Sequence, residues 1–90
     1  MQEGISQMKA ELEKKEFEAS SGGGAVSVRV TGAFEVREVS INPEVVSAGD
    51  VSMLQDLVMA ATNEALRDAR SNMKEEMSKL TGGMPIPGLV

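Results

Sequence analysis

The glycine run at residues 20–24, Ser-Ser-Gly-Gly-Gly, is the first stretch whose residue types could bind a ligand. Glycine-rich loops cradle phosphates where a helix follows, and a P-loop also ends in Gly-Lys-Ser/Thr. Here alternating valines follow, and the next lysine is Lys74. A flexible linker would need a folded domain upstream, and the residues before the run are too few to form one. The run therefore predicts the turn of a β-hairpin, with no nucleotide bound.

Side chains that commonly carry out catalysis or bind metals are scarce in this chain. It contains neither histidine nor cysteine, which removes a histidine base, a thiol nucleophile and the usual zinc ligands. The acidic residues do not follow the spacing of a calcium-binding loop. Phe17 and Phe34 are the only aromatic residues, so no platform for stacking bases is expected. We expect no catalytic residue, no metal and no cofactor, and we expect that the chain is not an enzyme.

The length and the net charge of the chain limit the remaining classes of protein. Ninety residues allow one small domain, expected over residues 1–81. A cytoplasmic protein is the default expectation, because the sequence contains neither a membrane-spanning apolar run nor a signal peptide. A net charge of −5 argues against non-specific nucleic-acid binding through total charge.

A short amphipathic helix is predicted at the start of the chain, over residues 1–13. Met1, Ile5, Met8 and Leu12 recur at spacings of four, three and four, so they share one helix face. That face packs either against the rest of the domain or against another helix at a subunit interface. The two arrangements coincide if two chains share one core.

Three strands are predicted next, at about residues 15–20, 25–31 and 34–41. A tight turn centred on Gly32, with a positive φ at that glycine, joins the second strand to the third. The alternation of apolar residues breaks between Val36 and Val39, which predicts a β-bulge near Arg37-Glu38. Asn42-Pro43 ends the third strand, and a loop is expected after it.

A single long helix is predicted over residues 51–80. Asp50 or Ser52 can cap its start, Thr81-Gly82-Gly83 ends it, and the uncharged residues 82–90 form a loose tail. Thirty residues of helix extend about 45 Å, whereas a compact domain of this size is only about 26 Å across. The helix must therefore project beyond its own domain.

The two halves of this helix differ in charge. Residues 50–66 carry a net charge of −3 and most of the apolar residues, so we expect them to pack on the sheet. Residues 67–79 carry a net charge of +1, and we expect them to project as an arm or to pair with the first helix. Asn63 is interpreted as a solvent-facing or hydrogen-bonded residue of the helix, or as an amide paired across an interface.

A projecting apolar helix and an open sheet edge both call for a partner. A symmetric homodimer is the simplest arrangement that supplies one.

Three segments cover nearly the whole chain: SSGGGAVSVRVTGAFEVREVSINPEVV, MLQDLVMAATNEALRDA and MSKLTGGMPIPG. Together, in this order and spacing, they resemble the YbaB/EbfC family of bacterial nucleoid-associated DNA-binding proteins. The resemblance implies an α+β fold: an α-β-β-β-α subunit with a three-stranded antiparallel sheet and a long projecting C-terminal helix, in a tweezer-like homodimer. It also implies binding to double-stranded DNA with little sequence preference, and a cytoplasmic, nucleoid-associated location. The implied roles are nucleoid organisation, gene regulation or recombination repair, with recombination-repair or clamp-loader proteins as further partners.

Candidate DNA contacts fall in two places. Arg67 matches a position that is commonly basic in the family, whereas Asp68 occupies one that is often basic. Clustering of positive charge in the same half of the long helix adds Arg70, Lys74 and Lys79. If these residues only solvate the helix in pairs with carboxylates, the first helix would supply the contacts instead, through Lys9, Lys14 and Lys15. The first helix is shorter than in many family members, which carry further residues upstream, often with lysines.

Two functions are carried forward, and no site for an enzyme or small-molecule binder is found. The first is a nucleoid-associated DNA-binding protein. The alternative is a protein-interaction module that serves a repair or replication partner without strong DNA binding of its own, which the acidic charge and the methionines of the long helix suit. Phosphate contacts give a steep salt dependence that is independent of DNA sequence, so a salt titration separates the two.

Overall fold

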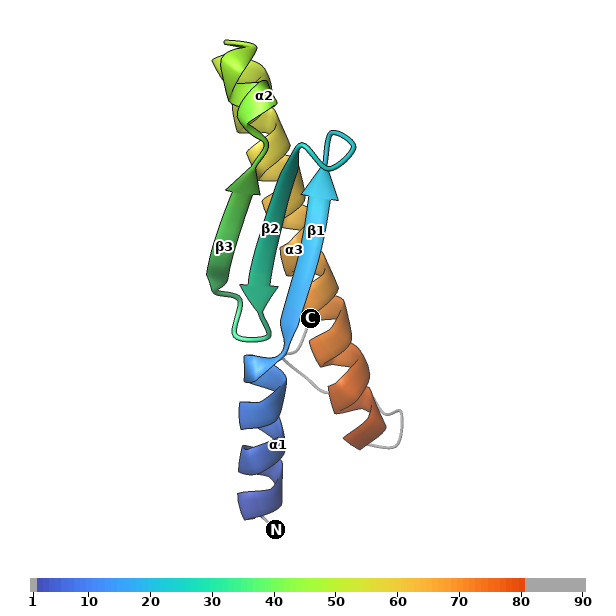
Figure 1. Ribbon diagram of the computed structural model, residues 1–90. Helices are drawn as coiled ribbons and strands as arrows, with labels where there is room; N and C mark the ends of the chain where they lie inside the picture. The colour runs from blue at the N-terminus through green and yellow to red at the C-terminus, as the bar shows by residue number, and fades with distance from the viewer. Residues whose placement is uncertain (1, 81–90) are drawn as a thin grey trace.

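The computed structural model describes residues 2–80, which form an elongated molecule of 54 × 21 × 18 Å (Figure 1). Its elements in chain order are α1 (Gln2–Lys14), β1 (Glu16–Ser21), β2 (Val26–Thr31), β3 (Val36–Ile41), α2 (Pro43–Ser47) and α3 (Val51–Leu80). The strands form one antiparallel sheet in the order β1-β2-β3. This confirms the α+β class and the α-β-β-β-α order. No helix of the described part is both long and apolar enough to cross a membrane. The predicted loose tail, residues 82–90, lies outside the described residues.

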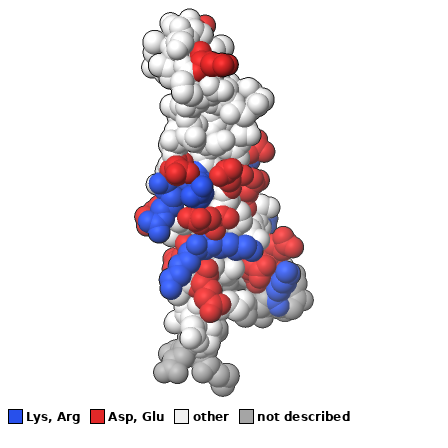
Figure 2. All heavy atoms as spheres, viewed as in Figure 1, with Lys and Arg blue, Asp and Glu red and all other residues white. Residues whose placement is uncertain are grey.

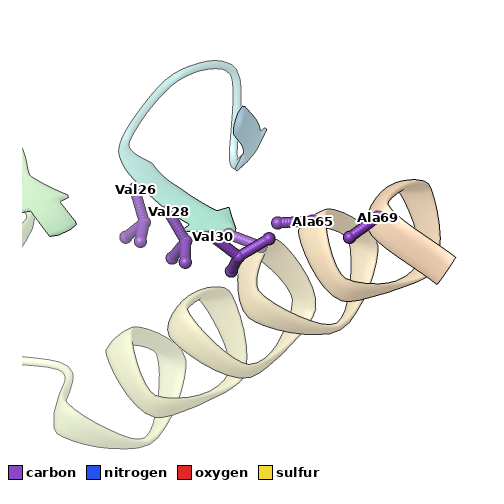
Figure 3. Packing of buried hydrophobic residues seen from close by; sticks show 6 residues of the cluster. Val26, Val28, Val30, Ala65 and Ala69 are labelled. Carbon is purple, nitrogen blue, oxygen red and sulfur yellow. The ribbon is translucent and has the colours of Figure 1, made fainter. Parts of the chain in front are cut away.

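The core is a single layer between the sheet and α3 (Figure 3). Val26, Val28 and Val30 alternate along β2, and their side chains are fully buried against the helix. The residues that face them are small: Ala61, Ala65 and Ala69 are also fully buried. Alanines at a spacing of four lie on one side of a helix and let its backbone come close to the sheet. The sequence alternation of β2 and the alanine spacing of α3 therefore specify the same contact.

α3 extends past the sheet at both ends (Figure 1). Its start is capped by Asp50, whose Oδ1 accepts a hydrogen bond from the Met53 backbone N–H at 2.9 Å. Packing on the sheet continues to the buried Ala69, one turn further than the charge pattern predicts. α1 makes only sparse contacts with the other elements, so α3 does not pair along its length with α1.

The glycine run forms the predicted turn between β1 and β2. Gly22, Gly23 and Gly24 all have positive φ, at 61°, 69° and 95°, which L-residues with a side chain adopt only under strain. Gly22 also lies against α3, because a Cβ there would come within 2.9 Å of a Leu57 methyl group. The Ser21 hydroxyl donates a hydrogen bond to the Leu57 carbonyl at 2.6 Å, which fixes this turn to the helix.

The turn between β2 and β3 differs from the prediction. The positive φ belongs to Phe34, at 64°, and not to Gly32, so β3 begins at Val36 instead of residue 34. Gly32 is required for another reason: a Cβ at this position would overlap the carbonyl of Leu12 at the end of α1. The buried Thr31 hydroxyl accepts hydrogen bonds from the backbone N–H groups of residues 33 and 35 and so shapes the turn.

The bulge predicted near Arg37-Glu38 is present. Arg29 pairs with Glu38 and Val30 pairs with Val36, which leaves Arg37 as the extra residue on β3.

The segment after β3 is a helix, α2, and the expectation of a loop was wrong. Asn42 caps it, with its Oδ1 accepting a hydrogen bond from the Glu44 N–H at 3.0 Å, and Pro43 takes the first helical position. Asparagine followed by proline is a helix-start signal as well as a strand-end signal.

Candidate nucleic-acid interface

Three basic residues of the distal half of α3 share one side of the helix. Arg67, Arg70 and Lys74 follow each other at spacings of three and four, which places neighbours on the same face. Each residue advances about 100° around the helix, so Arg67 lies roughly 200° from the buried Ala65. All three side chains are exposed. They therefore form a line along the side of α3 that faces away from the sheet, which we call the outer stripe.

The residues of the outer stripe are not neutralised locally. Among the described residues, none of the three makes an ion pair. Lys79, the fourth candidate of this half, differs: its Nζ lies 3.4 Å from Glu76 Oε1 and donates a hydrogen bond to it. Lys79 also lies only about 40° from the direction of Ala65, well away from the stripe. The structure thus aligns three of the four candidates on one face of α3 and places Lys79 on another, although Lys74 and Lys79 both line one hollow.

The acidic residues of this half lie mostly off the stripe. Asp68 and Glu75 point roughly 60–80° from the direction of Ala65, on a flank between the buried face and the outer face. The remaining carboxylate, Glu76, is the partner of Lys79. The net charge of +1 for residues 67–79 therefore understates how basic the outer face is.

The lysines of the N-terminal region do not form a comparable line. Lys9 and Lys14 are exposed on α1, but five residues separate them, which places them about 140° apart around the helix. The ammonium of Lys15 lies 5.9 Å from the centre of the Phe17 ring, over the first strand. Because α1 makes only sparse contacts with α3, these lysines stay separate from the outer stripe.

The face of the sheet away from α3 carries balanced charge. Arg29 lies between two carboxylates, with Nη2 3.0 Å from Glu38 Oε1 and Nε 3.7 Å from Glu18 Oε2. Blue and red atoms mix over the middle of this face in Figure 2, and no blue atom is visible on the upper part, which holds α2 and the start of α3. The sequence agrees, since residues 38–66 contain no Lys or Arg. Unpaired basic side chains are thus concentrated toward the other end of the molecule.

The glycine turn offers no phosphate site. The shallow hollow beside Gly22–Gly24, of about 370 Å³, is also lined by Asn42, the carboxylate of Glu44 and apolar side chains, and by no basic residue. No group of three potential metal ligands occurs within the described residues. A carboxylate beside a backbone loop disfavours a bound phosphate.

One neutral residue stands beside the outer stripe and was not among the sequence candidates. Asn63 precedes Arg67 by one turn, is exposed, and lines a hollow of about 280 Å³ together with Leu66, Arg67 and Arg70. Selecting residues by charge could not find it. Its spacing of four from Arg67 was the available signal.

The chain is similar to known proteins over most of its length. The chain is 56% identical over 89 residues to a nucleoid-associated protein of Alkaliphilus metalliredigens, covering 99% of this chain and 78% of that protein. It is 61% identical over 75 residues to a nucleoid-associated protein of Clostridium botulinum, covering 83% of this chain and 66% of that protein.

A solved structure is similar in fold. The crystal structure of an uncharacterized protein from Helicobacter pylori superimposes with a TM-score of 0.74 at 25% identity, covering 89% of this chain and 93% of that chain. The sequence model of the YbaB/EbfC DNA-binding family matches residues 1–84. With nearly the whole chain matched and with relatives more than half identical, the chain belongs to the YbaB/EbfC DNA-binding family of nucleoid-associated proteins.

Proposed function

We propose that this protein is a homodimeric, nucleoid-associated protein that binds double-stranded DNA with little sequence preference. In this proposal the outer stripe, Arg67, Arg70 and Lys74, contacts backbone phosphates. The single observation that carries it is the alignment of these exposed, unpaired basic side chains on one face of α3 in a chain of a DNA-binding family. The overall charge of −5 does not oppose such contacts, because screening limits each charge to about 8 Å at physiological salt.

The apolar residues that the monomer leaves exposed support dimerisation. Val36 and Val39 of β3 are 49% and 45% exposed, although their cross-strand partners Val30 and Val28 are fully buried. Cross-strand partners share a sheet face, so the apolar face of the core continues onto β3, where α3 no longer covers it. A second copy related by a two-fold axis would cover this face and the adjacent open edge of β3.

DNA binding is tested with a variant in which Arg67, Arg70 and Lys74 are all changed to Gln. Fluorescence anisotropy of a labelled duplex, measured over a range of salt concentrations, reports both affinity and salt slope. Each lost phosphate contact should lower the log–log slope by about 0.9, so the slope should fall by about 2.7 for each arm of the dimer that contacts DNA. Binding near physiological salt should weaken on the order of a hundredfold or more. An unchanged slope would remove these residues from the site and direct attention to Lys9, Lys14 and Lys15.

Dimerisation is tested by sedimentation at micromolar concentration. The wild-type protein should sediment at about twice the monomer mass of 9.5 kDa. Changing both Val36 and Val39 to Asp should yield a folded monomer, because these side chains are half exposed within one chain. A wild-type protein that is a folded monomer at this concentration would refute the dimer.

A protein-interaction module is the second candidate. It is favoured by the exposed apolar side chains at the start of α3 and on α2, which belong to Val46, Val51, Met53 and Met59. Methionine adapts to irregular partner surfaces, and a recombination-repair or clamp-loader protein is the expected kind of partner. Changing Met53 and Met59 to Glu distinguishes the roles: a partner surface predicts an intact dimer with unchanged DNA binding, whereas loss of the dimer would assign these residues to self-association.

A further inference from the structure

We propose that Asn63, Leu66, Arg67 and Arg70 form a subsite for one sugar–phosphate unit of the DNA backbone. This inference rests on the DNA-binding function proposed above and adds a neutral residue, Asn63, as a phosphate ligand. The four residues line one hollow of about 280 Å³ on the outer side of α3.

The hydrogen-bond donors around this hollow make no hydrogen bond or ion pair with other described residues. The Asn63 side chain is exposed and makes no hydrogen bond with any described residue, so its amide N–H groups are available. Arg67 and Arg70 are equally without ion pairs in the described part of the chain. A guanidinium donates paired hydrogen bonds that fit phosphate oxygens, and an amide adds two more donors. The hollow thus presents only positive or neutral donors to an anion.

Leu66 gives the hollow an apolar wall, which a cluster of charged residues alone would not provide. Its side chain is half-buried where it packs against the core, and its exposed part lines the hollow. An apolar wall fits the C–H edge of a deoxyribose and strengthens the neighbouring hydrogen bonds by lowering the local dielectric. The chemistry therefore matches a sugar and its phosphate better than a free anion.

The next hollow along α3 fits an anion less well. It is lined by Lys74, Lys79 and the carboxylate of Glu75, together with two serines. In this proposal Lys74 contributes a single positive charge near the DNA backbone, whereas the Asn63 hollow binds one sugar–phosphate unit. Loss of a charged phosphate contact lowers the salt slope of DNA binding, whereas loss of a neutral one lowers only the affinity. This difference makes the inference testable.

The test is the same anisotropy titration, made with an A·T-rich and a G·C-rich duplex. Asn63→Ala should weaken binding about tenfold or more on both duplexes, as expected when a hydrogen bond to a charged phosphate is lost, and should leave the salt slope unchanged because Asn63 carries no charge. Asn63→Asp, which is nearly isosteric, should weaken binding further. Gln55→Ala, which removes an exposed amide from the proximal half of α3, is the matched control and should have no effect.

A second pair of variants separates geometry from charge. Changing Arg67 and Arg70 to Lys keeps the charge but loses the paired donors, so affinity should fall about threefold to tenfold at an unchanged slope. If Asn63→Ala behaves like Gln55→Ala while the Gln variants of the stripe still lower the slope, the subsite is wrong and DNA binding by the stripe stands. A loss confined to one of the two duplexes would indicate base contact and would also overturn the subsite. An unchanged slope in the Gln variant would remove the outer stripe from the DNA site, and the subsite that rests on it would fall as well.

Discussion

The proximal half of α3, residues 51–66, packs Leu54, Leu57 and Val58 toward the sheet and bears no basic residue. The distal half, residues 67–80, holds one buried core residue, Ala69, and all the basic residues of the helix. The helix is continuous between the two halves, so packing of its proximal half on the sheet also fixes where the basic side chains lie. A rigid helix places charges more reproducibly than a loop of the same length would.

The position of a residue around α3 decides its exposure as much as its position along α3 does. Ala65 and Arg67 are two residues apart, yet one is fully buried and the other is exposed on the opposite side. Charge counted along the chain mixes the two faces, whereas charge counted around the helix separates them. The four predictions that follow test this separation, beginning with the largest expected effect.

Replacing Ala65 with Leu should destabilise the fold by about 1–3 kcal/mol, because the larger side chain does not fit between α3 and the buried valines of β2. The matched variant Ala60→Leu, at an exposed position of the same helix, should change stability by less than about 0.5 kcal/mol. Urea denaturation followed by circular dichroism measures both. Equal losses in the two variants would contradict the assignment of faces.

Gly22→Ala and Gly23→Ala test how the glycine turn holds the proximal half. Both residues have positive φ, so each change should cost about 1 kcal/mol in strain. Gly22→Ala should cost up to about 1 kcal/mol more, because its Cβ would displace a terminal methyl group of Leu57, whereas a Cβ at Gly23 meets nothing within 4 Å. The same denaturation assay compares them, and saturable binding of ATP to the wild type would contradict a purely structural turn.

Lys79→Gln tests whether all basic residues of the distal half are equivalent. Lys79 is paired with Glu76 and lies off the outer stripe, so its loss should lower the salt slope of DNA binding by clearly less than the roughly 0.9 expected for Arg67→Gln. A slope change equal to that of Arg67→Gln would mean that charge alone, and not the face, decides contact.

Asp56→Lys tests whether the start of α3 lies near the DNA. Asp56 is exposed, and its position is about 16 Å along the helix from Arg67 and about 10 Å from Asn63, both beyond the screening length of about 8 Å at physiological salt. Changing its charge by two units should therefore alter affinity by less than about twofold. An increase of tenfold or more would place DNA against the start of α3 as well.

Much of the fold follows from local pattern in the sequence. The strict alternation of Val26, Val28 and Val30 predicts β2, and the break before Val39 predicts the bulge on β3. Phe34 and Gly32 could not be assigned correctly, because which residue takes the positive φ depends on the end of α1, which occupies the space where a Cβ of Gly32 would lie. That contact joins segments that are far apart in sequence, and no local rule contains it.

The candidate site was predictable only in part. Clustering of charge found Arg67, Arg70 and Lys74, but it gave Lys79 the same weight, because the pairing with Glu76 depends on side-chain conformation. Asn63 carries no charge, so the sequence supported only a solvent-facing, hydrogen-bonded or interface amide, and the structure shows that it shares a hollow with two arginines. Roles for these residues and for Lys9, Lys14 and Lys15 in binding DNA stay predictions.

The most direct test of the central claim is an NMR titration of the labelled protein with a short DNA duplex. The account predicts that the side-chain signals of Asn63, Arg67 and Arg70 and the backbone amides of the distal half of α3 shift on binding. Signals from α2 and from the first two turns of α3 should stay unchanged. Shifts concentrated on α1, on the sheet or on α2, with the outer stripe unaffected, would contradict it.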